Sequence, residues 1–218
     1  MTGAYERELR DVLAGVSRGV EKVIKTCTPE ERERMRSVVQ RPFLVVRAAG
    51  SGMEGSGDLV ALRGDCSFPI EVKTRKGKKL YLAGRTKDQL AAMIREAERS
   101  ELMPLYAYRL KGVRGDSWRI FRVETNNLRG VLKALAQRIP SLPRTRTGSL
   151  FIDWDQGMPL NEFIALMCSK PTSDDRVVNS LKARVPSEPS SPVVKDSELD
   201  VWAELKARKS SEPSLLQR

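Results

Sequence analysis

The sequence predicts an α/β fold in which a mixed central β-sheet is flanked by α-helices. Short apolar segments follow one another closely from residue 43 onwards, as expected of strands. In the segments around them, apolar residues recur every three or four positions, as on one face of a helix. Beyond residue 170 the composition changes to Ser, Pro and Asp, so the folded part is expected to end there.

Three helices are expected in the first hundred residues. The first opens at Ala4 and continues to Ile24, and its apolar residues form one stripe that should be buried. Thr28 and Pro29 then form a capped start for a short charged helix that ends before Pro42. A further helix is expected at 86–99. The stripe of the first helix consists of Leu9, Val12, Leu13, Val16, Val20, Val23 and Ile24.

Five strands are expected, and the helix at 86–99 separates the third from the fourth. Their ranges are 43–48, 58–62, 68–74, 105–111 and 118–123. Residues 1–130 suffice for one core of ordinary size. The segment 131–170 is expected to extend this core, with a helix near 127–137 and a strand followed by a helix at 149–168.

Residues 171–218 are expected to form a disordered, Ser- and Pro-rich tail. Within it, Ser197 to Asp200 resembles a capping box, and Leu199, Trp202 and Leu205 would line one side of a short helix at 197–209. Two interpretations stay open. The helix docks a replication or repair protein, or it is a marginal helix without a partner, since isolated short helices are barely stable in water.

Two neighbouring predicted strands carry acidic and basic residues in a pattern typical of catalysis on phosphate. Asp58 opens one strand, and Glu71 and Lys73 lie at alternate positions of the next, so both face one side while Val72 faces the other. If these strands pair, Asp58 and Glu71 would hold one Mg²⁺, for which Mn²⁺ is expected to substitute. Lys73 would orient the attacking water and stabilise developing charge. The alternative is a solvated Glu and Lys on an edge strand.

This spacing resembles that of the PD-(D/E)XK nuclease superfamily, although Gly57 stands where the superfamily motif has a proline. The sequence Arg47-Ala-Ala-Gly-Ser51 upstream of Asp58, the residues around Glu6 and Arg7, and the position of Gln89 resemble archaeal Holliday junction resolvases. The resemblance fades near residue 130, and the segment 26–40 is longer than the family usually carries, a difference that bears on junction choice.

The resemblance implies a restriction-endonuclease-like sheet and a homodimer that cuts four-way DNA junctions by paired phosphodiester hydrolysis. It also implies that Glu6 joins Asp58 and Glu71 at the metal, that Ser51 lies at the scissile phosphate, and that Gln89 supports the site. Glu6, Ser51 and Gln89 each also have an ordinary structural interpretation. Glu6 is a favourable acid in the first turn of a helix, Ser51 a loop residue and Gln89 a surface residue of a helix.

The charge of the chain favours a polyanionic partner. Lys and Arg number 39 against 28 Asp and Glu, and residues 1–170 account for the whole excess, with 31 basic and 20 acidic side chains. Six basic residues near the candidate site are expected to contact DNA phosphates rather than bases. They are Arg7, Arg47, Arg75, Lys76, Lys78 and Lys79. The alternative for the last four is a solvated hairpin tip.

Several absences narrow the function. The chain contains no histidine, which excludes His-dependent hydrolysis and His-containing zinc sites. Its three cysteines, Cys27, Cys66 and Cys168, are too few and too far apart for a zinc cluster or a disulfide framework. Gly50 to Gly55 fits a dinucleotide-binding pattern, but a strand rather than a helix follows it. With neither a long apolar segment nor a signal pattern, a cytoplasmic, nucleoid-associated protein without membrane contact is expected.

Two other functions remain open. One is a related nuclease that uses the same site on flaps, DNA ends or foreign DNA. The other is a catalytically silent DNA-binding module, which would explain the charge but not the carboxylates, since acids near phosphate are repulsive unless a metal bridges them.

Overall fold

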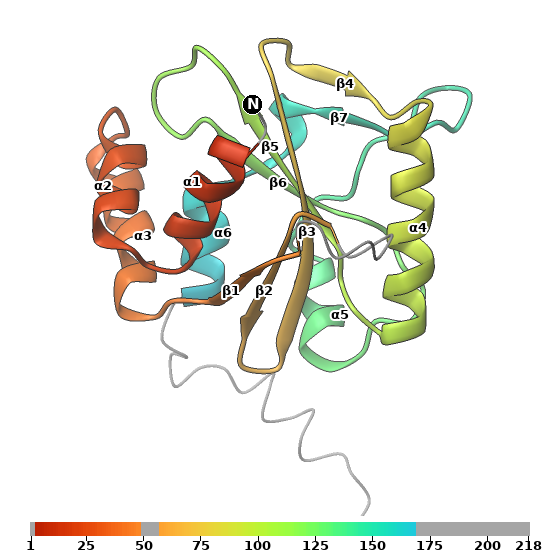
Figure 1. Cartoon of the computed structure of the whole chain (residues 1–218), viewed down its shortest axis with the longest axis horizontal. Helices are drawn as coiled ribbons and strands as arrows, with labels where there is room; N and C mark the ends of the chain where they lie inside the picture. Colours follow the sequence, from red (N-terminus) through yellow and green to blue (C-terminus); the bar gives the residue numbers. More distant parts are fainter. Residues whose placement is uncertain (1–2, 49–56, 169–218) are drawn as a thin grey trace, which may run out of the picture. The chain divides into compact units, whose positions relative to one another are not determined.

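The computed structural model describes residues 3–48 and 57–168. Helices lie on both sides of a central sheet (Figure 1): α1 (Gly3–Leu13), α2 (Ser17–Ile24) and α3 (Pro29–Gln40) lie on one side, and α4 (Arg85–Ser100) lies on the other. Ser51, the expected tail and its helix at 197–209 lie outside the described residues.

The segment expected to be one first helix is two helices, which corrects that prediction. Gly15 lies between α1 and α2 with φ +66°, and a Cβ there would come within 2.7 Å of the Val38 carbonyl oxygen. The turn therefore requires glycine, and α3 packs directly against it. Val16, counted in the apolar stripe, is 46% exposed because it lies in this turn, whereas Leu9 and Val20 are fully buried.

The second expected helix, α3, begins as the sequence predicts. Thr28 is its N-cap: the Thr28 side chain accepts a hydrogen bond from the Glu31 backbone N–H, and Glu31 accepts one from that of Thr28. This reciprocal capping box satisfies two backbone donors that the helix itself leaves unpaired.

The central sheet is mixed, as predicted. All neighbouring strands are antiparallel except β3 and β5, which are parallel and are connected through α4. The five expected strands are present with shifted ends, and a short sixth strand completes the sheet. In spatial order they are β1 (Leu44–Arg47), β2 (Leu59–Arg63), β3 (Cys66–Arg75), β5 (Leu105–Leu110), β6 (Trp118–Arg122) and β8 (Met158–Pro159).

A second, two-stranded sheet was not predicted. It pairs β4 (Lys79–Tyr81) with β7 (Phe151–Asp153) in antiparallel register. The segment that follows β3 therefore pairs with residues seventy or more positions later, in the region expected only to extend the core. The remaining elements are α5 (Gly130–Ala136), a 3₁₀ turn η1 (Trp154–Gln156) and α6 (Leu160–Cys168).

The two faces of the sheet form separate apolar clusters. In β5, Leu105 and Ala107 belong to the cluster that includes α1, α2, α3 and α6, whereas Tyr106 and Tyr108 belong to the cluster beneath α4. This division follows from the alternation of side chains along a strand. Leu132 of α5 also lies in the first cluster, so α5 and α6 are packed into the same core as the N-terminal helices.

Cys27, Cys66 and Cys168 are buried free thiols, as expected from their number and spacing. Of the helices within residues 3–48 and 57–168, none is long and apolar enough to cross a membrane.

A buried polar network joins α3 and α6 to the turn before β6. The Asp116 carboxylate accepts hydrogen bonds from the backbone N–H groups of Trp118 and Asn161 and from Nδ2 of Asn161, at 2.8–3.0 Å. Arg34 Nε donates to Oδ1 of Asn161 at 2.6 Å. Burial raises the pKa of Asp116, and these donors oppose that shift. The Asn161 side chain therefore connects an acid on one element with a guanidinium on another.

We expect Asn161→Ala to lower the free energy of unfolding by about 1–3 kcal/mol, because it removes one donor to a buried carboxylate and the acceptor of Arg34. Urea denaturation measures the change. Asn126→Ala is the matched control, since Asn126 bonds Glu98 on the surface, and it should change stability by less than about 0.5 kcal/mol. Equal effects of the two substitutions would contradict a structural role for the network.

Candidate active site

The pairing of β2 with β3 brings Asp58 to Glu71. The Asp58 backbone N–H donates to the Ile70 carbonyl at 2.9 Å, and the Asp58 carboxylate accepts from the Val72 N–H at 2.8 Å. The Asp58 side chain thus reaches β3 at Val72, the residue next to Glu71. The expected side-by-side arrangement of the two strands is confirmed.

Glu71 and Lys73 lie on one face of β3, as the alternation predicts, and Val72 is buried in the opposite core cluster. Lys73 Nζ lies 2.6 Å from Oε1 of Glu71 and 3.3 Å from Oε1 of Gln89, which belongs to α4. Glu71 is 8% exposed. The structure therefore brings Gln89 to the site through Lys73, so the ammonium is held between a carboxylate and an amide oxygen.

Glu6 belongs to α1, and its partner is Arg47, whereas the partner of Glu71 is Lys73. It is 7% exposed, and its Oε2 accepts from Nη2 of Arg47 at 3.0 Å. Arg47 is the last residue of β1 and is paired in register with Leu59. In this structure Arg47 neutralises Glu6, whereas the sequence predicted Arg47 to bind phosphate.

The carboxylates affect one another electrostatically. Burial, followed by the negative charge of Glu71 and that of Glu6, raises the pKa of Asp58 to about 6, against the hydrogen bond from the Val72 N–H. A carboxyl group whose pKa is raised by burial and by neighbouring negative charge is stabilised in its ionised form by a cation beside it. Their hard oxygen ligands suit Mg²⁺, which commonly uses one or two carboxylates.

The described residues do not present a ready group of three ligands. No cluster of three or more Asp, Glu, Cys or His side chains in the described ranges is arranged to hold a metal ion. The donor chemistry of Asp58 and Glu71 fits Mg²⁺, and ligation by Glu6 as a third carboxylate stays a prediction.

Gly57 explains why the proline of the superfamily motif is absent. Its φ is +72°, a left-handed conformation that proline cannot adopt, and a Cβ there would lie 2.7 Å from the Ile70 carbonyl oxygen. That oxygen accepts the Asp58 N–H. Glycine therefore allows the close approach of backbones that positions Asp58.

Apart from Arg47, which pairs with Glu6, the basic residues predicted to contact DNA fall into two groups. Arg7, Arg75 and Lys76 are exposed, and none of the ion pairs among the described residues involves them. Lys78 Nζ, by contrast, lies 2.9 Å from Asp155, and Lys79 Nζ lies 3.7 Å from Asp153. The charge of these two lysines is already partly neutralised.

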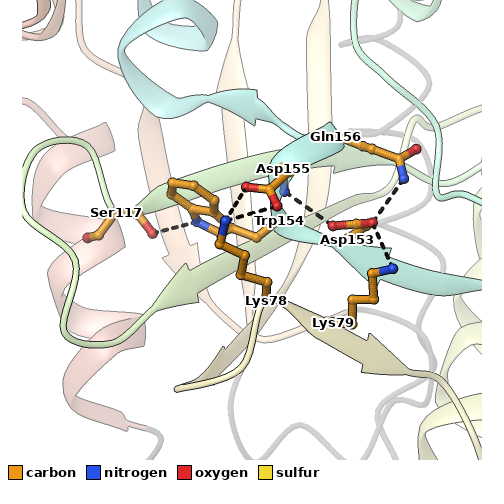
Figure 2. Close-up of polar contacts among 7 residues, drawn as sticks. All are labelled: Lys78, Lys79, Ser117, Asp153, Trp154, Asp155 and Gln156. Carbon is orange, nitrogen blue, oxygen red and sulfur yellow. Dashed lines mark hydrogen bonds and ion pairs between the residues drawn. The ribbon is translucent and has the colours of Figure 1, made fainter.

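Figure 2 shows how Lys78 and Lys79 reach these two acids of β7 and η1. The indole N–H of Trp154, between the two acids, donates to the Ser117 carbonyl at 3.2 Å, and Gln156 donates to Asp153 at 3.0 Å. The contacts hold the chain after β3 against residues just before β6 and α6. Sequence reasoning did not single out Asp153 or Asp155, and the alternation of acids around Trp154 was the available signal.

A mixed sheet that presents an acid beside a Glu-x-Lys strand is the arrangement to which the resemblance to PD-(D/E)XK nucleases pointed. A family model described as archaeal Holliday junction resolvase (Hjc) matches residues 22–171. The chain therefore belongs to the archaeal Holliday junction resolvase family, which makes it a DNA-binding nuclease of recombination and repair.

The match begins after Glu6 and Arg7, so the likeness expected around these residues lies outside it. It continues to residue 171, which corrects the expectation that the likeness ends near residue 130. Among solved structures, the chain is similar to Hjc of Archaeoglobus fulgidus, a Holliday junction resolvase from an archaeal hyperthermophile. The identity is 24%, the match covers 66% of this chain and 95% of that one, and the TM-score is 0.40. No curated protein gives a significant match.

We expect Gly57→Ala to destabilise the protein more than Gly64→Ala and to abolish DNA cleavage. Both glycines have positive φ, a left-handed conformation that is unfavourable for alanine, so each substitution should lower the free energy of unfolding by about 1–2 kcal/mol for this reason alone. At Gly64 a Cβ meets nothing within 4 Å, whereas at Gly57 it meets the Ile70 backbone. Thermal unfolding and a cleavage assay on each variant measure the difference. Equal stability of the two variants would show that the close approach at Gly57 is unimportant.

Proposed function

We propose that this protein is a Mg²⁺-dependent endonuclease that resolves four-way DNA junctions by paired hydrolysis of two phosphodiester bonds. The observation that supports this most directly is the convergence of Asp58, Glu71 and Lys73 at neighbouring positions of β2 and β3. The family to which the chain belongs indicates the class of substrate, a Holliday junction.

In this proposal Asp58 and Glu71 hold Mg²⁺, for which Mn²⁺ can substitute, and Glu6 assists from α1. The ion, when bound, supplies Lewis acidity at the scissile phosphate. Ser51, which lies outside the described residues, contacts that phosphate.

Lys73 provides the main electrostatic stabilisation by a side chain in this mechanism. A water molecule attacks the phosphorus and loses a proton to the solvent, the bond from phosphorus to the leaving oxygen breaks, and the leaving oxygen takes up a proton from the solvent. The Lys73 ammonium orients the water and stabilises the charge that develops on the phosphate oxygens. Gln89 keeps one hydrogen bond to Lys73 and so limits the positions that the ammonium can take.

We further propose a homodimer, because resolution needs two cuts and a two-fold axis presents two identical sites to a two-fold symmetric junction. Arg75, Lys76 and Arg7 contact phosphates that flank the cleaved one, and Arg47, Lys78 and Lys79 contribute when DNA competes with their carboxylate partners. The C-terminal segment recruits a replication or repair protein, and the enzyme works at the nucleoid. The contacts of these basic residues with DNA recognise the backbone and the shape of the junction rather than its bases.

Glu71→Gln is expected to lower the single-turnover cleavage of a labelled four-way junction by at least about 100-fold while junction binding is retained. The substitution removes the carboxylate charge that binds the cation and pairs with Lys73, and it keeps the side-chain size. Glu124→Gln, at an exposed glutamate paired with Arg144, is the control and should cleave normally.

The same assay should include duplex, flap and single-stranded DNA, each with Mg²⁺ or with EDTA. Paired nicks on the junction alone that EDTA abolishes support the proposed function. Cleavage chiefly of flaps or ends would assign the site to a related nuclease activity. Tight binding without any cleavage would instead identify a catalytically silent DNA-binding protein.

The basic residues should differ in the salt dependence of junction binding. Arg75→Ala and Lys76→Ala are each expected to weaken binding and to lower the slope of log K against log salt by about 1. Lys78→Ala should change the slope less, because Asp155 already neutralises much of that charge. Fluorescence anisotropy titrations at several salt concentrations measure the slopes. A larger slope change for Lys78→Ala than for Lys76→Ala would refute this division.

A further inference from the structure

Tyr106 carries a buried hydroxyl that the proposed mechanism does not use. The residue is fully buried, and its hydroxyl has no hydrogen-bond partner within the described part of the chain. Tyr108, two positions along the same strand, differs in this respect, because its hydroxyl donates to the Gly77 carbonyl at 2.5 Å. A buried hydroxyl without a partner is rare and calls for a physical reason.

The register of the sheet places Tyr106 beside Glu71. The two residues are direct partners in the parallel pairing of β3 with β5, so their side chains stand on the same face, beneath α4. Burial, followed by the negative charges of Glu71 and of Asp58, raises the pKa of the Tyr106 hydroxyl. A tyrosine hydroxyl is a hydrogen-bond donor, so Tyr106 presents a donor on the face of the sheet that carries Glu71.

The resting position of Lys73 shows when such a donor is needed. Within the described residues, Lys73 is the one hydrogen-bond donor to the Glu71 carboxylate, at 2.6 Å. When Lys73 turns to the attacking water and the phosphate, the three N–H groups of its ammonium are divided among more acceptors, so its bond to Glu71 weakens. Glu71, which is 8% exposed and would hold the metal through its carboxylate, then needs a further donor to fix its orientation.

We propose that the Tyr106 hydroxyl is a positioning group that holds the Glu71 carboxylate while Lys73 acts on the substrate. This inference rests on the proposed nuclease function of the same site. The hydroxyl has no partner among the described residues in the resting enzyme, where Lys73 donates to Oε1 of Glu71, and it donates to Glu71 when Lys73 turns to the substrate. Tyr106 therefore acts through Glu71 and does not itself contact the reacting atoms.

The test compares Tyr106→Phe with Tyr108→Phe, which remove one hydroxyl each from the same face of β5. For each full-length variant, thermal unfolding and junction binding are measured without metal, Mn²⁺ binding is measured by calorimetry, and single-turnover cleavage is measured across a range of Mg²⁺ concentrations. Wild type and Glu71→Gln are run alongside, so that a failure of the nuclease proposal is visible separately.

Tyr106→Phe should unfold at the wild-type temperature or above it, since no hydrogen bond of the resting protein is lost. It should bind the junction normally, bind Mn²⁺ more weakly and cleave about 10-fold more slowly, with a higher half-saturating Mg²⁺ concentration. Tyr108→Phe should show the opposite pattern, a lower unfolding temperature with unchanged metal dependence, because its bond to Gly77 is structural.

Wild-type cleavage and metal dependence in Tyr106→Phe, while Glu71→Gln is inactive, would overturn the role of Tyr106 and leave the nuclease intact. A lowered unfolding temperature in Tyr106→Phe with normal Mn²⁺ binding would also overturn it, since the hydroxyl would then serve stability alone. An inactive wild type would instead contradict the proposed function on which the inference rests.

Discussion

The antiparallel contact between the start of β2 and the middle of β3 is the constraint on which the site depends. One backbone bond, from Asp58 to Ile70, and one side-chain bond, from Val72 to Asp58, fix the acid of one strand against the next. The first bond requires Gly57 in a left-handed conformation, because any Cβ would meet the Ile70 backbone. Backbone geometry rather than side-chain packing therefore sets the distance between the two acids, and the alternation of β3 then places Lys73 beside them.

The charges around this contact are balanced in pairs. Lys73 accompanies Glu71, and Arg47 accompanies Glu6, so each of these two buried carboxylates has one cationic partner. Within residues 3–48 and 57–168, the Asp58 carboxylate has the Val72 N–H as its one hydrogen-bond donor, and its raised pKa reflects burial and its acidic neighbours. A divalent cation beside Asp58 would relieve this repulsion, and phosphate would compete with the carboxylates for the cationic partners. The resting pairs are consistent with a site that rearranges when substrate arrives.

Much of this site could be predicted from the sequence because it depends on local rules. Strand alternation places Glu71 and Lys73 on one face without knowledge of the fold, and a capping box places the start of α3. The contacts between β4 and β7 could not be predicted in this way, since Lys79 and Asp153 are far apart in the sequence and no local pattern links them. The break between α1 and α2 was missed because the apolar spacing continues through Val16, whereas the backbone turns at Gly15 where α3 packs. The role of Tyr106 likewise depends on its register with Glu71, which no spacing along one strand can show.

The segment 26–40, which the sequence predicts to be longer than in the family, is attached to the core rather than to the acids. Its helix α3 packs against α6 and α2, and Arg34 joins it to Asn161 and, through that side chain, to the buried Asp116. The Gly115 backbone N–H donates to Thr26, which ties the beginning of the segment to the same turn before β6. Asp58, Glu71, Lys73 and Gln89 take no part in these bonds. The segment therefore contributes α3 to the helical layer on the α1 side of the sheet, and an effect of the segment on junction choice would have to come from the surface of that layer rather than from the chemistry of the site.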